Sequence, residues 1–510
     1  MLQSAVKKTK KRFAMARIEY RNEEDSIGAK KVPAEAYYGV QSLRAAENFS
    51  ITGESMNKHM IISLAEIKKA CAIVNHNVGL LESRKSKAIE KACDEIIRGK
   101  LHEEFIVDPI QGSAGTSMNM NANEVIANRA IELLGGEKGD YSIVHPNDHV
   151  NYGQSTNDVI PSAGKMTILK LWASCEKTLW QLYDAFVEKE EEFDGIIKMG
   201  RTQMQDAVPI RLGQEFHAYA VATKRGIDRV NNVIGEMREL NMGGTAIGTG
   251  LNADKTYYKD IVPEIAKVSG LELVQADDLI DGTMHLDSFS AVSSALKSLA
   301  VALSKICSDL RLMSSGPRCG FGEINLPAKQ NGSSIMPGKV NPVIPEVLNQ
   351  VCFNIIGNDV TVAMAAEAGQ LELNAFEPII YYNLFQSIET LDHAVDTFTV
   401  NCIRGITVNE KHCEELVDNS VGVVTAICPH VGYKKAASVA KKAIKKGTSV
   451  RKLIIDEGML TKQELDKILD PMGMTTPGIA AEELLIRKGK KPAKKVTAKK
   501  SADGKTTNNR

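Results

Sequence analysis

A glycine-rich loop at residues 332–342, GSSIMPGKVNP, has the composition of an anion-binding site. Its glycines let the backbone expose N–H groups, Lys339 adds a positive charge and Asn341 adds a neutral donor. A P-loop for nucleotide phosphates is disfavoured, because five residues separate Gly332 from Gly338 and Val340 occupies the position of the magnesium-binding hydroxyl. The composition alone also fits an ordinary surface turn.

Four further polar, glycine-rich segments occur at residues 111–124, 145–158, 199–209 and 243–252. They carry neutral hydrogen-bonding side chains, which singly are typical of helix caps and turns. These are Thr116, Ser155, Thr156, Asn157, Thr202 and Gln203. Together with the charge and donor of loop 332–342, this set predicts a pocket for a small, doubly charged, polar substrate.

Three other patterns have plainer interpretations. His145 and His149 stand four residues apart, but Pro146 places them at a helix start or in a loop, so a small-anion pocket or capping is favoured over metal binding. The GGTAIGTG run at 243–250 follows a long helix rather than a strand, which favours a helix-ending loop over a dinucleotide site. No G-x-S-x-G nucleophile elbow occurs.

Long helices must position these segments. From Phe289 to Met313, apolar residues recur at alternating spacings of three and four, and a second stripe of the same kind runs from Leu212 to Met237. Each pattern predicts one continuous helix with a single apolar face. Helices of this length pack side by side, so the sequence predicts an all-α bundle and makes packing between subunits plausible.

Charge and cysteine content limit the class of protein. The zero net charge is a cancellation, because residues 1–17 and 487–510 hold sixteen basic side chains and one acid. The body between them is therefore acidic. The nine cysteines are scattered without a C-x-x-C pair, which disfavours a disulfide framework or a zinc site and indicates a reducing compartment. No uninterrupted apolar run suggests a membrane span.

Five of these segments, in this order, resemble the motifs of the aspartase/fumarase superfamily. They are residues 115–124, 145–148 with 154–158, 200–209, 243–250 and 332–342. The resemblance runs from about residue 18 to 485 and leaves out both basic tails. Gln203 favours the aspartase branch, because class II fumarases usually have His there. Residues 21–25, 36–39 and 366–374 also look aspartase-like.

The resemblance implies a long helical bundle and a homotetramer whose sites draw on several subunits. It also implies reversible elimination of ammonia from L-aspartate to give fumarate, through an aci-carboxylate formed when the β-proton is removed. A class II fumarase is the alternative, followed by a catalytically silent bundle scaffold. No organic cofactor and no metal ligand set are implied, although a divalent cation activates some members.

The resemblance also assigns roles. Ser333 is the expected base, with its oxyanion stabilised by loop N–H groups and by Lys339. Thr116, Ser155, Thr156 and Ser334 are expected to hold the β-carboxylate. Lys339, Asn341 and Thr202 are expected to hold the α-carboxylate, and Asn157 and Gln203 to face the amino group. Loop 332–342 is expected to close over the substrate as a lid.

The chain is expected to divide into five parts. These are a basic extension (1–17), an N-terminal domain (18–155), a central bundle (156–410), a C-terminal helical domain (411–486) and a disordered basic tail (487–510). The basic tails are interpreted as solvated, with nucleic-acid binding unlikely and no membrane partner. A cytoplasmic location is expected.

Overall fold

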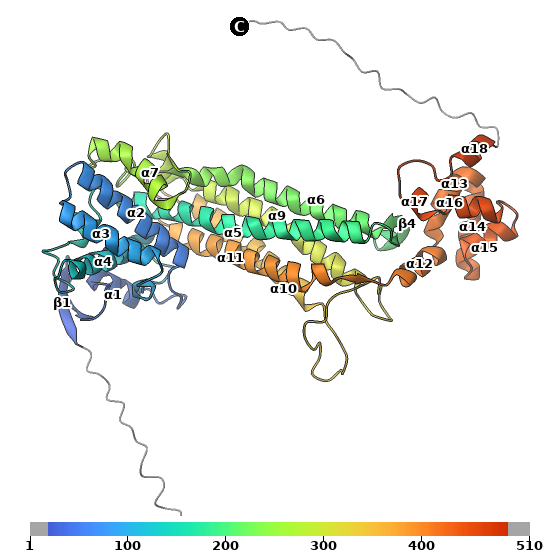
Figure 1. The fold of residues 1–510 in the computed structure, drawn as a ribbon, viewed down its shortest axis with the longest axis horizontal. Helices are drawn as coiled ribbons and strands as arrows, with labels where there is room; N and C mark the ends of the chain where they lie inside the picture. The colour runs from blue at the N-terminus through green and yellow to red at the C-terminus, as the bar shows by residue number, and fades with distance from the viewer. Residues whose placement is uncertain (1–18, 488–510) are drawn as a thin grey trace, which may run out of the picture. The chain divides into compact units, whose positions relative to one another are not determined.

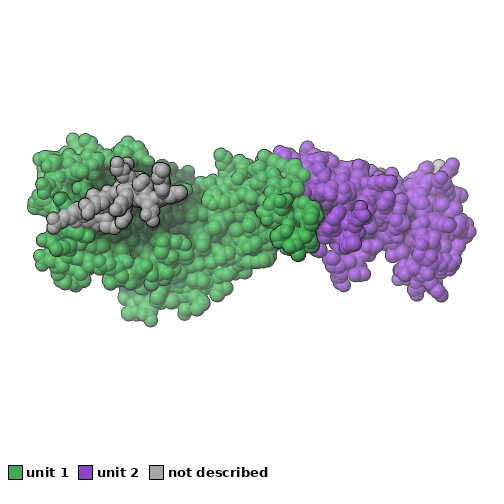
Figure 2. Space-filling view, turned by 90° about the horizontal axis from the view of Figure 1, so that it is seen from below, with its two compact units in different colours: residues 1–185, 220–311, 327–405 green, residues 186–219, 312–326, 406–510 purple. Residues whose placement is uncertain are grey.

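The computed structural model describes residues 19–487. The predictions for the basic extension and for the tail lie outside these residues, apart from Arg487 at the end of the last helix. The chain forms two compact units, drawn in different colours in Figure 2. Unit 1 holds the residues up to 185 with 220–311 and 327–405, and unit 2 holds 186–219, 312–326 and the residues from 406 onward. The predicted boundaries at 155/156 and 410/411 stay predictions.

Helices dominate both units, as the periodicity predicts (Figure 1). The helices up to residue 313 are α1 (Val40–Asn48), α2 (Lys58–Asn77), α3 (Ser83–Ile97), α4 (Thr116–Leu133), α5 (Thr156–Glu192), α6 (Leu212–Ile234), α7 (Lys255–Ser269), α8 (Asp281–Met284) and α9 (Asp287–Met313). Those that follow are α10 (Val343–Glu367), α11 (Glu377–Asn401), α12 (Glu410–Asn419), α13 (Val424–Val431), α14 (Tyr433–Lys446), α15 (Val450–Asp456), α16 (Lys462–Ile468), α17 (Pro471–Met474) and α18 (Glu483–Arg487).

The strands are short and form four two-stranded sheets among the described residues. The pairs are β1 (Tyr20–Asp25) with β2 (Gly28–Pro33), β3 (Ile197–Thr202) with β4 (Gln205–Arg211), β5 (Glu239–Leu240) with β6 (Val274–Gln275), and β7 (Ile324–Asn325) with β8 (Thr407–Val408). The interpretation of residues 199–209 as a loop between helices is wrong, because this segment is the β3–β4 hairpin.

Both predicted apolar stripes are confirmed. Every stripe residue from Phe289 to Met313 is buried on α9, and every one from Leu212 to Met237 is buried on α6 or on the 3₁₀ turn after it. Their spacing keeps these side chains on one helix face, where burial of apolar area stabilises the packed helices.

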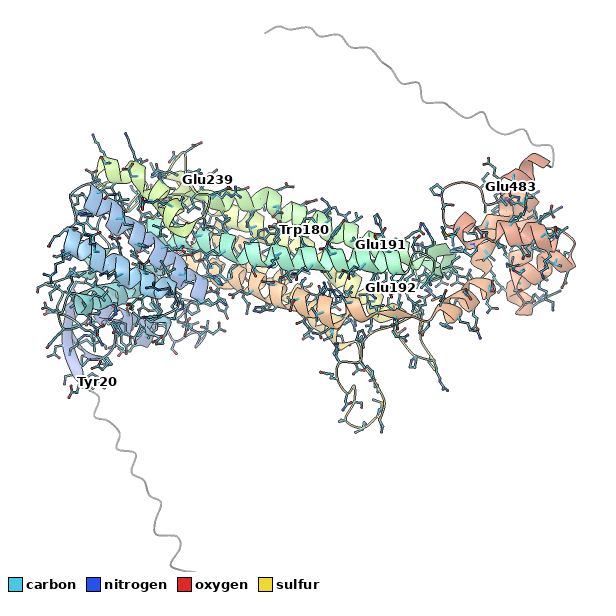
Figure 3. The ribbon with its side chains drawn as sticks, in the orientation of Figure 1. Tyr20, Trp180, Glu191, Glu192, Glu239 and Glu483 are labelled. Atoms are coloured by element: carbon cyan, nitrogen blue, oxygen red, sulfur yellow. The ribbon has the colours of Figure 1, made fainter. Side chains whose placement is uncertain are left out.

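The long helices of unit 1 form a bundle whose members contact one another through side chains (Figure 1). Trp172 of α5 donates to Asn231 of α6 (Nε1 to Oδ1, 2.8 Å). Lys297 of α9 binds Asp359 of α10 (2.5 Å). Helix α5 also reaches α2 and α11, and its Trp180 packs edge to face with Tyr183, with ring centroids 5.4 Å apart (Figure 3). These contacts hold the long helices of the bundle in place, so the segments of the candidate site start from rigid helix ends.

Unit 2 has its own aliphatic core. Helices α12 to α16 enclose residues such as Ile427, Val439, Ile454 and Leu465, and Met199 of β3 joins the same cluster. Within the described residues one helix, α9, is long and apolar enough to cross a membrane, but half of its most apolar window is buried inside the protein. That burial fits its place as one of the packed helices of the bundle.

Candidate active site

The first residues of α4 and α5 meet in unit 1. Gly115 immediately precedes α4 and packs against Ile160 of α5, where an added Cβ would lie 3.0 Å from Cγ2. Asn119 of α4 donates from Nδ2 to Oγ1 of Thr156, the first residue of α5 (3.3 Å). Thr116 is the first residue of α4. Two helix N-termini with hydroxyl side chains therefore lie side by side, an arrangement that attracts anions.

Asp158 fixes the turn that begins α5. Its carboxylate is fully buried and accepts backbone N–H groups from Ser155 (2.9 Å), Gly243 (3.2 Å) and Thr245 (3.1 Å). Burial, the largest effect, raises the pKa of Asp158 to about 6 despite these bonds. One carboxylate thus joins the 154–158 segment to the glycine-rich 243–250 loop.

Asn157 strengthens the same junction. Its Nδ2 donates to the carbonyl oxygen of Ala246 (2.7 Å), and its own carbonyl accepts from Nδ2 of Asn241 (3.0 Å). The 243–250 run is therefore a loop that braces the start of α5. It follows the short strand β5 rather than the long helix α6 directly.

Loop 332–342 is closed by its own hydrogen bonds. Gly332 donates its N–H to the carbonyl of Lys339 (2.8 Å), and Asn341 Nδ2 donates to the carbonyl of Gly332 (2.7 Å). Only glycine fits at 332, because an added Cβ would lie 2.5 Å from the Lys339 carbonyl oxygen. The side chains at Ser334 and Lys339 are exposed.

Ser333 lies inside this closed loop, and its Oγ accepts two backbone N–H groups. The donors are Ile335 (3.2 Å) and Met336 (3.1 Å). Backbone donors aimed at an oxygen stabilise negative charge there. The arrangement therefore favours an alkoxide at Ser333, which is the form that can act as a base.

Thr202 and Gln203 occupy the exposed tip of the β3–β4 hairpin in unit 2. Gln203 and Met204 adopt left-handed backbone conformations (φ 53° and 64°), which turn the chain tightly. Thr202 is the last residue of β3 and pairs with Gln205 of β4, whereas Gln203 lies in the turn, and both side chains are exposed. The adjacent Arg201 binds buried Glu323 (2.8 Å) and lies over the Phe321 ring (4.3 Å to its centroid).

Neutralising Glu323, the buried partner of Arg201, should destabilise the β3–β4 hairpin. Glu323 also lies 3.4 Å from Lys198, so Glu323→Gln leaves two cations without their shared carboxylate. We expect the free energy of unfolding to fall by about 3 kcal/mol, measured by denaturant titration. Glu190→Gln, which removes the partner of the exposed His217, should cost below about 0.5 kcal/mol. Equal effects of the two substitutions would contradict this role of Glu323.

The predicted residues thus fall into three clusters. Thr116, Ser155, Thr156 and Asn157 are together at the starts of α4 and α5; Ser333, Ser334, Lys339 and Asn341 share one loop; Thr202 and Gln203 share one turn. Within the part of unit 1 that the structure describes, no hydrogen bond joins the first cluster to the second. In Figure 1, α4 lies at one end of the bundle, and α10, which follows loop 332–342, begins toward the other.

The histidine pair caps a turn, as expected. His145 Nδ1 accepts the N–H groups of Asn147 and Asp148 (both 3.2 Å) at the start of a short π-helix, Pro146–Val150. His149 faces the N–H of His145 and the ammonium of Lys85. Among residues 19–487, no group of three or more His, Cys, Asp or Glu side chains is placed to hold a metal ion.

Three residues of this region were not predicted as site residues: Lys68, Asn119 and Asp158. Asn119 alternates with Asn121 and Asn123 on α4, and all three are buried. Several amides on a buried helix are a signal for an internal polar network, because buried polar groups need partners. Lys68 gave no such signal, since a lysine on a helix is ordinarily exposed.

Two protein-family models match this chain. The family described as "Lyase" matches residues 28–357, and the family described as "Fumarase C C-terminus" matches residues 423–476. Aspartate ammonia-lyase of Bacillus subtilis is 54% identical over 467 residues, covering 92% of this chain and 98% of the relative. The Escherichia coli enzyme of the same name is 46% identical, covering 91% and 97%.

Two solved structures share the fold. A fumarate lyase:delta crystallin from Brucella melitensis, bound to cobalt, has a TM-score of 0.88 and 48% identity, covering 90% of this chain and all of the other. Class II fumarase from Schistosoma mansoni has a TM-score of 0.86 and 37% identity, with the same coverage.

Proposed function

The chain belongs to the lyase family whose model spans residues 28–357, and on this premise we propose that it is an aspartate ammonia-lyase. It converts L-aspartate reversibly to fumarate and ammonia. The observation that carries the proposal is Ser333, whose Oγ faces two backbone N–H groups in a loop that only glycine at 332 can close.

The chemistry follows from the weak acidity of the proton beside the β-carboxylate. The Ser333 alkoxide takes this proton, and the electron pair moves into the β-carboxylate to give an aci-carboxylate with two negative charges. The pair then returns to form the double bond as the C–N bond breaks and the amine leaves. Donors already aimed at the developing charge lower this barrier.

The other residues take the binding roles that the family resemblance implies. Thr116, Ser155, Thr156 and Ser334 hold the β-carboxylate, and the helix N-termini under the first three support a dianion there. Lys339, Asn341 and Thr202 hold the α-carboxylate. Asn157 and Gln203 face the amino group, where the uncharged Gln203 accepts a hydrogen bond but does not act as a proton acceptor as a His could.

A homotetramer completes the site in this proposal. The α4–α5 cluster and loop 332–342 lie far apart along one bundle, so in this proposal a second copy supplies the missing segment (Figure 1). Helix α10 supports this, because it buries one face on the bundle and exposes an apolar stripe on another. The exposed stripe is Phe353 (60%), Val360 (59%) and Met364 (68%), whose spacing keeps them on one helix face.

Charging this stripe should dissociate the assembly. Phe353→Lys places an ammonium where the proposal buries an aromatic ring between subunits, so we expect smaller species in light scattering and a loss of turnover together. Lys177→Glu on α5 is the control for a surface charge change, since Lys177 is exposed and outside the stripe. A Phe353→Lys protein that stays tetrameric would contradict the assignment of this face.

The proposal needs no organic cofactor, because the base and the charge-stabilising donors all come from the chain. A divalent cation activates some members of the family, and the proposal assigns it no site in this chain. A cytoplasmic location is supported by nine free cysteines, most of them buried thiols with burial-raised pKa values.

The experiment is turnover of L-aspartate by purified protein after treatment with a chelator. We expect fumarate, followed by its ultraviolet absorbance, and ammonia in equal amounts. Fumarate with added ammonium should give L-aspartate in the reverse direction. Absence of both reactions would overturn the proposed function.

A further inference from the structure

Lys68 of α2 is a buried cation beneath the α4–α5 cluster. Its side chain is 0% exposed, and its Nζ donates to three amide oxygens. The acceptors are Asn119 Oδ1 (2.6 Å), Asn151 Oδ1 (2.8 Å) and Gln154 Oε1 (2.8 Å). All three donors of the ammonium are therefore satisfied by neutral groups.

Burying an ammonium among neutral groups costs free energy. A lysine kept at such a position therefore points to a function for its charge. Desolvation, the largest effect, lowers the pKa of Lys68 to about 8, and the thiols of Cys71 and Cys93 and the carboxylate of Asp158 offset it in part. The Asp158 carboxylate is itself occupied by three N–H groups. A lysine at this position thus supplies positive charge that no direct contact neutralises.

The three acceptors connect Lys68 to the site. Asn151 and Gln154 belong to the turn that leads into Ser155, and Asn151 Oδ1 also accepts from Asn119 (3.2 Å). Asn119 forms the direct link, because its oxygen accepts from Lys68 while its Nδ2 donates to Oγ1 of Thr156. Because the Lys68 ammonium holds the Asn119 oxygen, the Asn119 Nδ2 faces the Thr156 hydroxyl.

This orientation fixes the role of the Thr156 hydroxyl. A hydroxyl whose oxygen accepts a hydrogen bond keeps its hydrogen available for another partner. Along a chain of hydrogen bonds, each donor polarises the next one. Here the Lys68 ammonium begins the chain and the Thr156 O–H ends it. The positive charge makes this O–H a stronger hydrogen-bond donor, and the gain is larger toward a dianion than toward a monoanion.

We propose that Lys68 is a positioning residue for the reaction, which acts through Asn119 to hold the Thr156 hydroxyl as a donor to the substrate's β-carboxylate and to strengthen it as the aci-carboxylate forms. This rests on the proposed function, because it uses the β-carboxylate placed at Thr156. Lys68 touches neither substrate nor reacting atoms.

The test uses two variants and one matched control in the full-length protein. Lys68→Met removes the charge and keeps the length of the side chain. Asn119→Asp keeps an acceptor for Lys68 but cannot donate to Thr156, so the hydroxyl turns toward the new carboxylate. Lys69→Met is the control, since Lys69 is the next residue on α2 and pairs with Asp94 (2.7 Å) instead.

We expect kcat for L-aspartate to fall about 100-fold in Lys68→Met and in Asn119→Asp, with KM changed less than about threefold. Lys69→Met should change neither. Asn119→Asp should be as stable to heat as the wild type, because it gives Lys68 a carboxylate partner. If Lys68→Met does not fold, Asn119→Asp decides the question: full kcat in a stable Asn119→Asp protein would overturn the proposal.

Calorimetric binding separates this inference from the proposed function. The probes are succinate, a ground-state dicarboxylate, and 3-nitropropionate, whose nitronate has the planar shape of the aci-carboxylate and negative charge on both of its oxygens. Lys68→Met should lose about 100-fold in nitronate affinity and below about threefold in succinate affinity. Equal losses for both probes would overturn the role of Lys68. Wild-type protein that binds the nitronate but does not turn over L-aspartate would contradict the proposed function alone.

Discussion

Replacing Ser333 with alanine is expected to lower kcat for L-aspartate by about three orders of magnitude and to leave KM nearly unchanged. The substitution removes the oxygen that accepts the N–H groups of Ile335 and Met336, and with it the proposed base. The loop should keep its shape, because the bonds between Gly332, Lys339 and Asn341 do not involve the Ser333 side chain. Steady-state kinetics in both directions measure the effect.

Ser298→Ala is the matched control for this substitution. Among residues 19–487 the Ser298 hydroxyl donates only to the Ser294 carbonyl within helix α9 (3.0 Å), so its loss should leave kcat unchanged. Circular dichroism and light scattering should show the same fold and assembly for both variants. A Ser333→Ala enzyme with wild-type kcat would remove Ser333 from the role of base.

Replacing Asp158 with alanine is expected to lower both stability and activity. The buried N–H groups of Ser155, Gly243 and Thr245 would lose their shared acceptor, which we expect to lower the free energy of unfolding by about 4 kcal/mol. The start of α5 would no longer be fixed, so kcat/KM should fall more than about 100-fold. Denaturant titration and kinetics measure the two effects.

Asp254→Asn separates this effect from ordinary helix capping. Asp254 caps α7 by accepting the N–H groups of Thr256 (2.7 Å) and Tyr257 (3.2 Å). Its replacement should shift the denaturant midpoint of unfolding only slightly and leave kcat/KM unchanged. Similar losses of activity in the two variants would contradict a specific role for Asp158.

The raised pKa of Asp158 adds a pH dependence. Protonation weakens the carboxylate as an acceptor, so wild-type kcat/KM should fall as the pH decreases through about 6. The loss occurs on the acid side, because the ionised form is the one that holds three N–H groups. Asp158→Asn, which cannot ionise, should lack this limb of the profile.

The long helices could be predicted from the sequence because their apolar spacing is local information. The stripe beginning at Phe289 fixes both the helix and its buried face, and the structure confirms each residue of it. The β3–β4 hairpin was missed for a physical reason. Its strands carry mixed polar residues, a bulge interrupts the register between Met199 and Arg201, and its turn uses non-glycine residues with positive φ.

The segments of the candidate site were singled out from the sequence, but the residues that support them were not. Ser333, Thr156 and Asn157 belong to polar, glycine-rich segments, and their roles in the site stay predictions. Lys68 and Lys69 are adjacent in sequence and identical in type, yet only Lys68 is fully buried. Tertiary packing decides which of the two becomes internal, and no local pattern encodes that.

The charge distribution restricts how an anion is attracted. The body between the basic tails is acidic overall, so its bulk field does not draw aspartate toward the site. Attraction must come from local groups: Lys339, the two helix N-termini and the loop N–H groups. In the role proposed for it, buried Lys68 adds positive charge to the side of the site where the second negative charge develops.

The central claim is tested most directly by measuring kcat/KM for L-aspartate, L-malate and adenylosuccinate side by side with the purified protein. The account predicts efficient release of fumarate from L-aspartate and at most slow reaction of the other two. A higher kcat/KM for L-malate than for L-aspartate would contradict it and identify the chain as a fumarase.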